Sequence, residues 1–91
     1  MTGRCEATVL IRNKRGLHAR ASAKFVTVAA AYTADIEVAK DGSGVNGTSI
    51  MGLMMLAAAP GDEIRITASG PDAEAALAEL TKLVEDKFGE E

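Results

Sequence analysis

The sequence is poor in the residues on which several classes of protein depend. Among 91 residues it has one cysteine, one histidine, two prolines, three aromatic residues and no tryptophan. A single cysteine cannot form an internal disulfide, so we expect the reducing environment of the cytoplasm. One cysteine and one histidine also leave too few ligands for a typical transition-metal site. We therefore expect neither a metal nor a cofactor.

Long apolar runs are missing as well. No run approaches the roughly 20 apolar residues of a membrane helix, and the first six residues lack the apolar stretch of a signal peptide. In contrast, 47% hydrophobic and 25% charged residues are the proportions of an ordinary folded protein and exclude a disordered chain. We expect one small domain over residues 1–91, with a site on its surface and no membrane partner.

The net charge of −3 conceals an uneven distribution. Residues 1–40 contain seven Lys and Arg against three acids, whereas residues 41–91 contain three against ten. A basic stretch without acids comprises Arg12, Lys14, Arg15, Arg20 and Lys24. It is either a solvated surface or a face for an anion or an acidic partner. Nucleic acid is disfavoured, because the pI is near 5 and no aromatic residues interleave the basic ones.

Periodicity along the chain predicts the element order βαββαβα. Strands are predicted at residues 6–12, 35–40, 44–48 and 63–69, and helices at 19–31, 50–58 and from Pro71 to about Lys87. The Asp41-Gly42 pair predicts a hairpin between the second and third strands, so the sheet cannot be all parallel. We predict an α+β open-faced sandwich, in which a four-stranded antiparallel sheet carries three helices on one face.

The only histidine, His18, follows a predicted turn at Gly16 and precedes the first predicted helix. A lone histidine is usually a surface or packing residue, but the free N–H groups of a helix N-terminus bind anions, phosphate above all. A neutral imidazole there is a nucleophile, and the planar guanidinium of Arg20 can pair with two phosphate oxygens. No second base, nucleotide-binding loop or metal cluster is recognisable in the sequence. We therefore expect a covalent carrier that receives an activated phosphoryl group from a partner, and not an independent enzyme.

The segment Gly16-Leu17-His18-Ala19-Arg20 resembles the phosphorylation motif of the HPr family, the phosphocarriers of the bacterial phosphoenolpyruvate-dependent phosphotransferase system. The segment Ser49-Ile50-Met51-Gly52-Leu53-Met54 resembles the second signature of that family. The resemblance implies that His18 accepts phosphate on Nδ1 from phosphorylated Enzyme I and passes it to a IIA-type acceptor, with Arg20 stabilising the phosphate. One departure is Ala21, where the family very often has proline. We expect a looser first helical turn and intact chemistry.

Ser49 is predicted to be the N-cap of the second helix. The resemblance also implies that an ATP-dependent HPr kinase/phosphorylase phosphorylates this serine in many bacteria. The two roles are compatible, because a phosphoserine at a helix N-terminus is electrostatically favoured.

An apolar docking patch is predicted on the same helix. Leu53 and Leu56 take the inward positions, so Ile50, Met51 and Met54 are expected to face solvent, whereas Met55 could belong to the core. The resemblance supports docking of both donor and acceptor here, with Ala19, Arg20 and Lys24 beside the patch.

We expect a monomer. The alternative is a regulatory binding module of the same fold that acts through this patch. Known HPr-like regulators without phosphotransfer lack the histidine, so His18 argues against that alternative.

Overall fold

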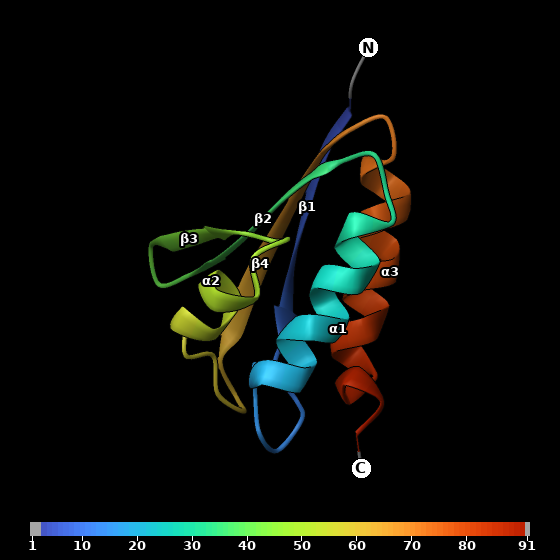
Figure 1. The fold of residues 1–91 in the computed structure, drawn as a ribbon. Coiled ribbons are helices and arrows are strands. Elements are labelled where there is room, and N and C mark those ends of the chain that lie inside the picture. Colours follow the sequence, from blue (N-terminus) through green and yellow to red (C-terminus); the bar gives the residue numbers. More distant parts are fainter. Residues whose placement is uncertain (1–2, 91) are drawn as a thin grey trace.

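The computed structural model describes residues 3–90, which form a sheet with helices packed on one face (Figure 1). In chain order the elements are β1 (Gly3–Leu10), α1 (Ala19–Ala30), β2 (Asp35–Lys40), β3 (Ser43–Asn46), α2 (Ile50–Met55), β4 (Glu63–Gly70), α3 (Ala73–Glu85) and a short turn of helix, η1 (Lys87–Gly89). The predicted order βαββαβα and the α+β open-faced sandwich are confirmed.

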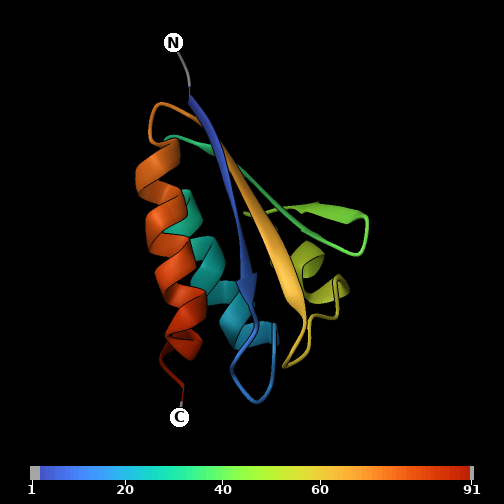
Figure 2. The same ribbon diagram turned by 180° about the vertical axis from the view of Figure 1, so that it is seen from behind.

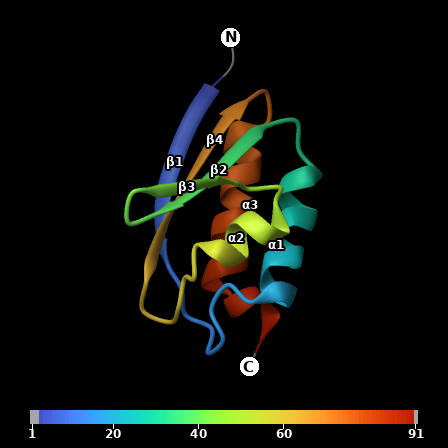
Figure 3. The ribbon, with the colours of Figure 1, turned by 60° about the vertical axis from the view of Figure 1, so that its left-hand side comes forward.

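The sheet has the strand order β1-β4-β2-β3, and every neighbouring pair is antiparallel. β1 runs beside β4 along its whole length, from Gly3 opposite Gly70 to Leu10 opposite Glu63 (Figure 2). α1 and α3 lie side by side, whereas α2 packs against β3 and α1 (Figure 3). This arrangement brings the N-terminus of α1 and the short helix α2 to the same end of the molecule.

The core lies between the sheet and the helices. Strand alternation turns Val38, Ile64 and Ile66 inward, and α1 contributes Phe25; each of these side chains is at most 1% exposed. Burial of one such side chain contributes about 1.5–3 kcal/mol. Phe88, which comes from η1 and not from a predicted helix, is equally buried. Phe88 therefore anchors the described residues after α3 to the core.

The predicted ends of the strands differ from the observed ones by up to three residues. β1 begins at Gly3 and ends at Leu10, although Ile11 still exchanges backbone hydrogen bonds with the turn at residues 61–62. β3 ends at Asn46, whose side-chain oxygen accepts the N–H of Thr48 at 2.8 Å and turns the chain. β4 extends one residue further, to Gly70.

All three helices are shorter than predicted, although α1 is shorter by only one residue, since it ends at Ala30. α2 ends at Met55, and Ala57 already has a left-handed backbone with φ of +54°. α3 does not begin at Pro71, because Asp72 is its N-cap and Ala73 its first residue. It ends at Glu85 because Lys87 turns into the left-handed region. None of the helices in residues 3–90 combines the length and apolar character needed to cross a lipid bilayer.

Candidate functional site

His18 is the N-cap of α1, and its ring takes part in the cap. The backbone is extended at this residue (φ −77°, ψ 179°), and its carbonyl accepts the first helical N–H, from Ser22, at 2.8 Å. The ring atom Nδ1 accepts the backbone N–H of Arg20 at 3.2 Å. Because a backbone N–H can only donate, Nδ1 must carry a lone pair, and the proton of the neutral ring is on Nε2. The geometry therefore leaves the lone pair on Nδ1, the nitrogen that can act as a nucleophile.

The loop that leads to His18 is fixed by contacts on both sides. The buried Asn13 donates from Nδ2 to the carbonyl of Gly16 at 2.8 Å, and Leu17 donates its N–H to the carbonyl of Ala58 at 3.0 Å. Gly16 has φ of +65°, and a Cβ atom at this position would lie 2.2 Å from the Ala58 oxygen. Only glycine fits at this position. The turn predicted at Gly16 therefore fixes the backbone that leads into His18, the N-cap of α1.

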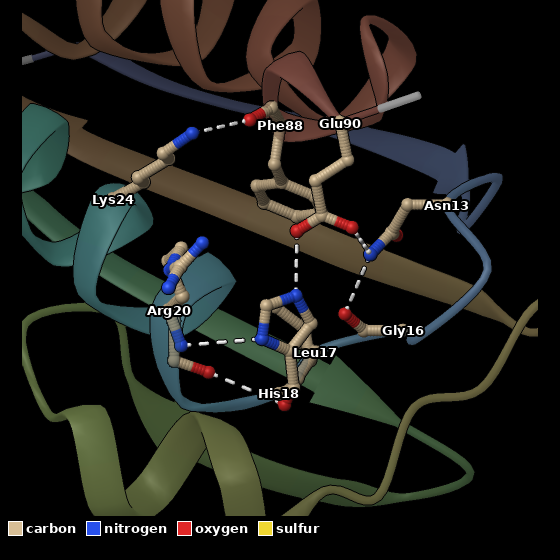
Figure 4. A network of polar contacts seen from close by, with 9 residues as sticks. Asn13, Gly16, Leu17, His18, Arg20, Lys24, Phe88 and Glu90 are labelled. Atoms are coloured by element: carbon tan, nitrogen blue, oxygen red, sulfur yellow. Dashed lines mark hydrogen bonds and ion pairs between the residues drawn. The ribbon is translucent and has the colours of Figure 1, made fainter.

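The ring of His18 contacts a residue that the sequence did not point to, Glu90. Oε2 of Glu90 lies 2.5 Å from Nε2 of His18, and its other oxygen, Oε1, accepts from Nδ2 of Asn13 at 3.1 Å (Figure 4). Burial by itself raises the pKa of Glu90, but hydrogen bonds from Asn13 and His18 and electrostatic attraction to the His18 ring and to Lys24 lower it below its ordinary value. Glu90 is thus an ionised acceptor for the Nε2 proton at neutral pH.

The two predicted basic residues of α1 have different surroundings. Within residues 3–90 the exposed guanidinium of Arg20 makes no hydrogen bond or ion pair, so it is available to an anion beside Nδ1. In contrast, Nζ of Lys24 donates to the carbonyl oxygen of Phe88 at 2.7 Å. Lys24 therefore holds the chain after α3 in place, a role that its exposed helical position did not indicate. Ala19, the first residue of α1, is exposed.

The predicted cap of α2 is confirmed, since Oγ of Ser49 accepts the N–H of Gly52 at 2.9 Å. The apolar side chains that follow are exposed, with Met51 at 71%, Met54 at 41% and Ile50 at 40%. The prediction that Met55 could belong to the core is wrong, because it is 78% exposed. Leu53 and Leu56 fill the inward positions of this short helix. The exposed patch of Ile50, Met51, Met54 and Met55 is called the α2 patch below.

Within residues 3–90, no three His, Cys, Asp or Glu side chains gather in a way that could hold a metal ion. The structure brings together the lone pair of His18 Nδ1, at the N-terminus of α1, and the guanidinium of Arg20, which has no partner among residues 3–90. Helix α1 also packs against α2, which carries the α2 patch. Such an arrangement can accept and hold a phosphoryl group.

Comparisons with known proteins agree on one family. Residues 5–86 match the family described as the PTS HPr component phosphorylation site. The phosphocarrier protein HPr of Neisseria meningitidis is 49% identical over 83 residues, which cover 91% of this chain and 93% of the relative. A crystal structure of HPr-C-His from Thermoanaerobacter tengcongensis superposes with a TM-score of 0.92 at 46% identity, over 96% of this chain and 98% of the other.

The same fold occurs in a protein of a different name. A crystal structure of Crh, the catabolite repression protein of Bacillus subtilis, superposes with a TM-score of 0.75 at 44% identity, over 87% of this chain and 91% of the other. That structure is described as a dimer with a swapped domain.

Proposed function

This chain belongs to the HPr family, and on that premise we propose that it carries a phosphoryl group on Nδ1 of His18 between proteins of the phosphotransferase system. The donor is phosphorylated Enzyme I, and the acceptor is a histidine of a IIA-type protein. The observation that carries the proposal is the N-cap geometry of His18, which leaves a lone pair on Nδ1 at the positive end of α1.

Transfer is an exchange between two histidines. The Nδ1 lone pair attacks the phosphorus on the donor, so a P–N bond forms at His18 while the P–N bond of the donor breaks. The N–H of Arg20, which Nδ1 accepts before transfer, then donates to a phosphoryl oxygen. The guanidinium of Arg20 pairs with the remaining charge. The second transfer reverses these steps, and the carrier needs no cofactor of its own.

Docking is assigned to the surface around this site. The α2 patch offers flexible thioether side chains that adapt to more than one partner. Ala19 provides a small exposed residue at the start of α1, and Arg20 and Lys24 add positive charge that steers acidic partners. Met55 joins the predicted docking residues Ile50, Met51 and Met54 because it is the most exposed of them.

Labelling tests the assignment directly. Incubation with phosphoenolpyruvate and Enzyme I is expected to add one acid-labile phosphate to the protein and none to His18→Ala. Arg20→Ala is expected to slow labelling, whereas Arg12→Ala, which removes an exposed positive charge from the preceding loop, serves as the matched control. Full labelling of His18→Ala would refute the proposal.

We also propose that Ser49 is phosphorylated by an HPr kinase/phosphorylase. The support is that Ser49 is half-buried and caps α2, so a phosphate on Oγ would lie at the N-terminus of that helix beside the α2 patch. The added charge would repel acidic partners. Acid-stable label from ATP and the kinase should appear in the wild type and vanish in Ser49→Ala. Equal labelling of the two proteins would exclude this regulation.

The alternative, a regulatory module without phosphotransfer, has less support. The match to Crh is compatible with it, but His18 at the N-cap, together with an Arg20 side chain that has no partner among residues 3–90, favours the carrier. We further propose that the carrier acts as a monomer in the cytoplasm. Sedimentation at working concentration tests the monomer, since a swapped dimer would double the mass.

A further inference from the structure

After α3 the chain passes through an unusual turn, here called the 86–90 strap (Asp86–Glu90). Lys87, Phe88 and Gly89 all have left-handed backbones, with φ of 58°, 56° and 75°. Two of the three are not glycine, and such residues adopt this conformation only where surrounding contacts enforce it. The 86–90 strap is therefore an ordered segment that its contacts hold in one conformation, and not a frayed helix end.

Three kinds of contact hold the strap. Phe88 is 1% exposed and belongs to the core, and its carbonyl accepts Nζ of Lys24 at 2.7 Å. Within the strap, Gly89 donates its N–H to Asp86 at 3.0 Å and Glu90 to Lys87 at 2.9 Å. Together these contacts deliver the Glu90 carboxylate to the ring of His18, where Asn13 fixes its second oxygen (Figure 4).

The position of this carboxylate has a chemical consequence for the ring. A carboxylate on Nε2 keeps the proton on that nitrogen and fixes the plane of the imidazole, so the lone pair stays on Nδ1. When Nδ1 binds phosphorus, the ring becomes positively charged, and a carboxylate at 2.5 Å offsets that charge. A carboxylate that orients and stabilises a histidine ring is a recurrent arrangement in enzymes.

We propose that Glu90, presented by the 86–90 strap, is a positioning residue that directs phosphoryl transfer to Nδ1 of His18. It acts through the ring and does not touch the phosphoryl group, so the inference rests on the proposed carrier function. In the step itself the P–N bond of the donor breaks and the P–Nδ1 bond forms. The Nε2 proton stays on the ring throughout, donated to the carboxylate of Glu90.

The test compares Glu90→Gln with Glu85→Gln in the full chain. Both remove one carboxylate near the end of α3, but Glu85 is exposed and forms no ion pair with a residue in the range 3–90. Glu90→Gln is expected to slow labelling by Enzyme I about tenfold, the lower end of the usual effect of losing such a partner. Glu85→Gln should label at the wild-type rate, and Glu90→Asp, which keeps the charge on a shorter side chain, should be intermediate.

Nitrogen NMR of the His18 ring separates positioning from a merely structural role. The wild type should show a protonated Nε2 and an unprotonated Nδ1, whereas Glu90→Gln should show a shifted Nε2 signal and faster exchange of the Nε2 proton with water, because an uncharged amide replaces the carboxylate. Wild-type labelling kinetics together with unchanged ring signals in Glu90→Gln would overturn the inference. Failure of the wild type to accept phosphate from Enzyme I would instead remove the carrier function itself, so the two failures are distinguishable.

Discussion

Replacement of Gly16 by alanine tests whether the loop before His18 has the rigidity that the structure gives it. The added Cβ atom would lie 2.2 Å from the oxygen of Ala58 and 3.1 Å from Cα of Ala59. Both neighbours are backbone atoms and cannot rotate away as a side chain can. An ordinary contact therefore requires the loop to move away from residues 58–59 on the order of 1 Å.

The expected loss of stability has two parts. An alanine at φ of +65° costs about 1–2 kcal/mol in left-handed strain. Displacement of the loop also stretches the 3.0 Å hydrogen bond from Leu17 to Ala58, which contributes about 0.5–1.5 kcal/mol. Together with the remaining close contact to residues 58–59, the expected loss of unfolding free energy is about 2–4 kcal/mol. The total stability of a domain of this size is about 5–10 kcal/mol. The variant should fold but unfold earlier in denaturant.

The matched control is Gly42→Ala in the β2–β3 hairpin. Gly42 has φ of +85°, but a Cβ atom there meets nothing within 4 Å, so this variant carries the strain without the clash. Urea unfolding should show Gly16→Ala to be the less stable of the two by about 1–2 kcal/mol. Labelling of His18 should slow only in Gly16→Ala, because a shift of this size misplaces the nucleophile. Equal stabilities, or wild-type labelling in Gly16→Ala, would refute the reasoning.

Three further substitutions test separate contacts. Hydrogen bonds from the Ala59 N–H and from Lys40 lower the pKa of the Asp62 carboxyl group in the folded protein. Asp62 therefore stabilises the fold at pH values above the ordinary pKa of an aspartate, and this contribution is lost as the pH falls through the lowered pKa of the folded state. Asp62→Asn should therefore reduce thermal stability at pH 7, and this difference from wild type should vanish in strong acid. Ser49→Ala should lower the free energy of unfolding by about 1 kcal/mol through loss of the cap, whereas Ser49→Thr should retain most of it. Ala21→Pro introduces the residue that the family usually has, in the first turn of α1, where the backbone N–H groups have no helical partners. In urea unfolding it should raise the stability by about 0.4–1 kcal/mol, without changing the labelling of His18. Lower stability would show that the buried site of Ala21 has no room for the proline ring.

The parts of the site that the sequence predicted are those set by neighbouring residues. A glycine followed by a helical pattern was enough to place His18 at the start of α1, and a serine before Ile50 was enough to place the cap of α2. Likewise, the alternation of apolar and polar residues identified the inward side chains of the strands, because successive side chains of a strand point to opposite faces of the sheet. The element order followed from these local signals and the Asp41-Gly42 hairpin.

The parts that were missed depend on contacts between distant residues. Glu90 lies 72 positions after His18, and it reaches the ring only because Lys87 and Phe88 adopt left-handed backbones that no sequence pattern indicates. The same turn ended α3 earlier than its periodicity predicted. Lys24 lies on the exposed face of α1, where a lysine is expected to extend into solvent. Its hydrogen bond to the Phe88 carbonyl forms only because the 86–90 strap brings that carbonyl close. Tertiary packing decided each of these features.

The geometry of the cap also explains how a carrier can both accept and release its cargo. Before transfer, Nδ1 of His18 is the acceptor for the N–H of Arg20, an interaction of the kind that contributes about 1 kcal/mol to a helix. In the proposed transfer a phosphoryl oxygen would take the place of Nδ1 as acceptor, and the helix dipole would add about 0.3–1 kcal/mol in favour of the negative charge. One acceptor replaces another at the same N–H group, so α1 remains capped in both states. Under the proposed function, the fold would neither trap the phosphoryl group nor oppose it strongly, and the docked partner would determine the direction of transfer.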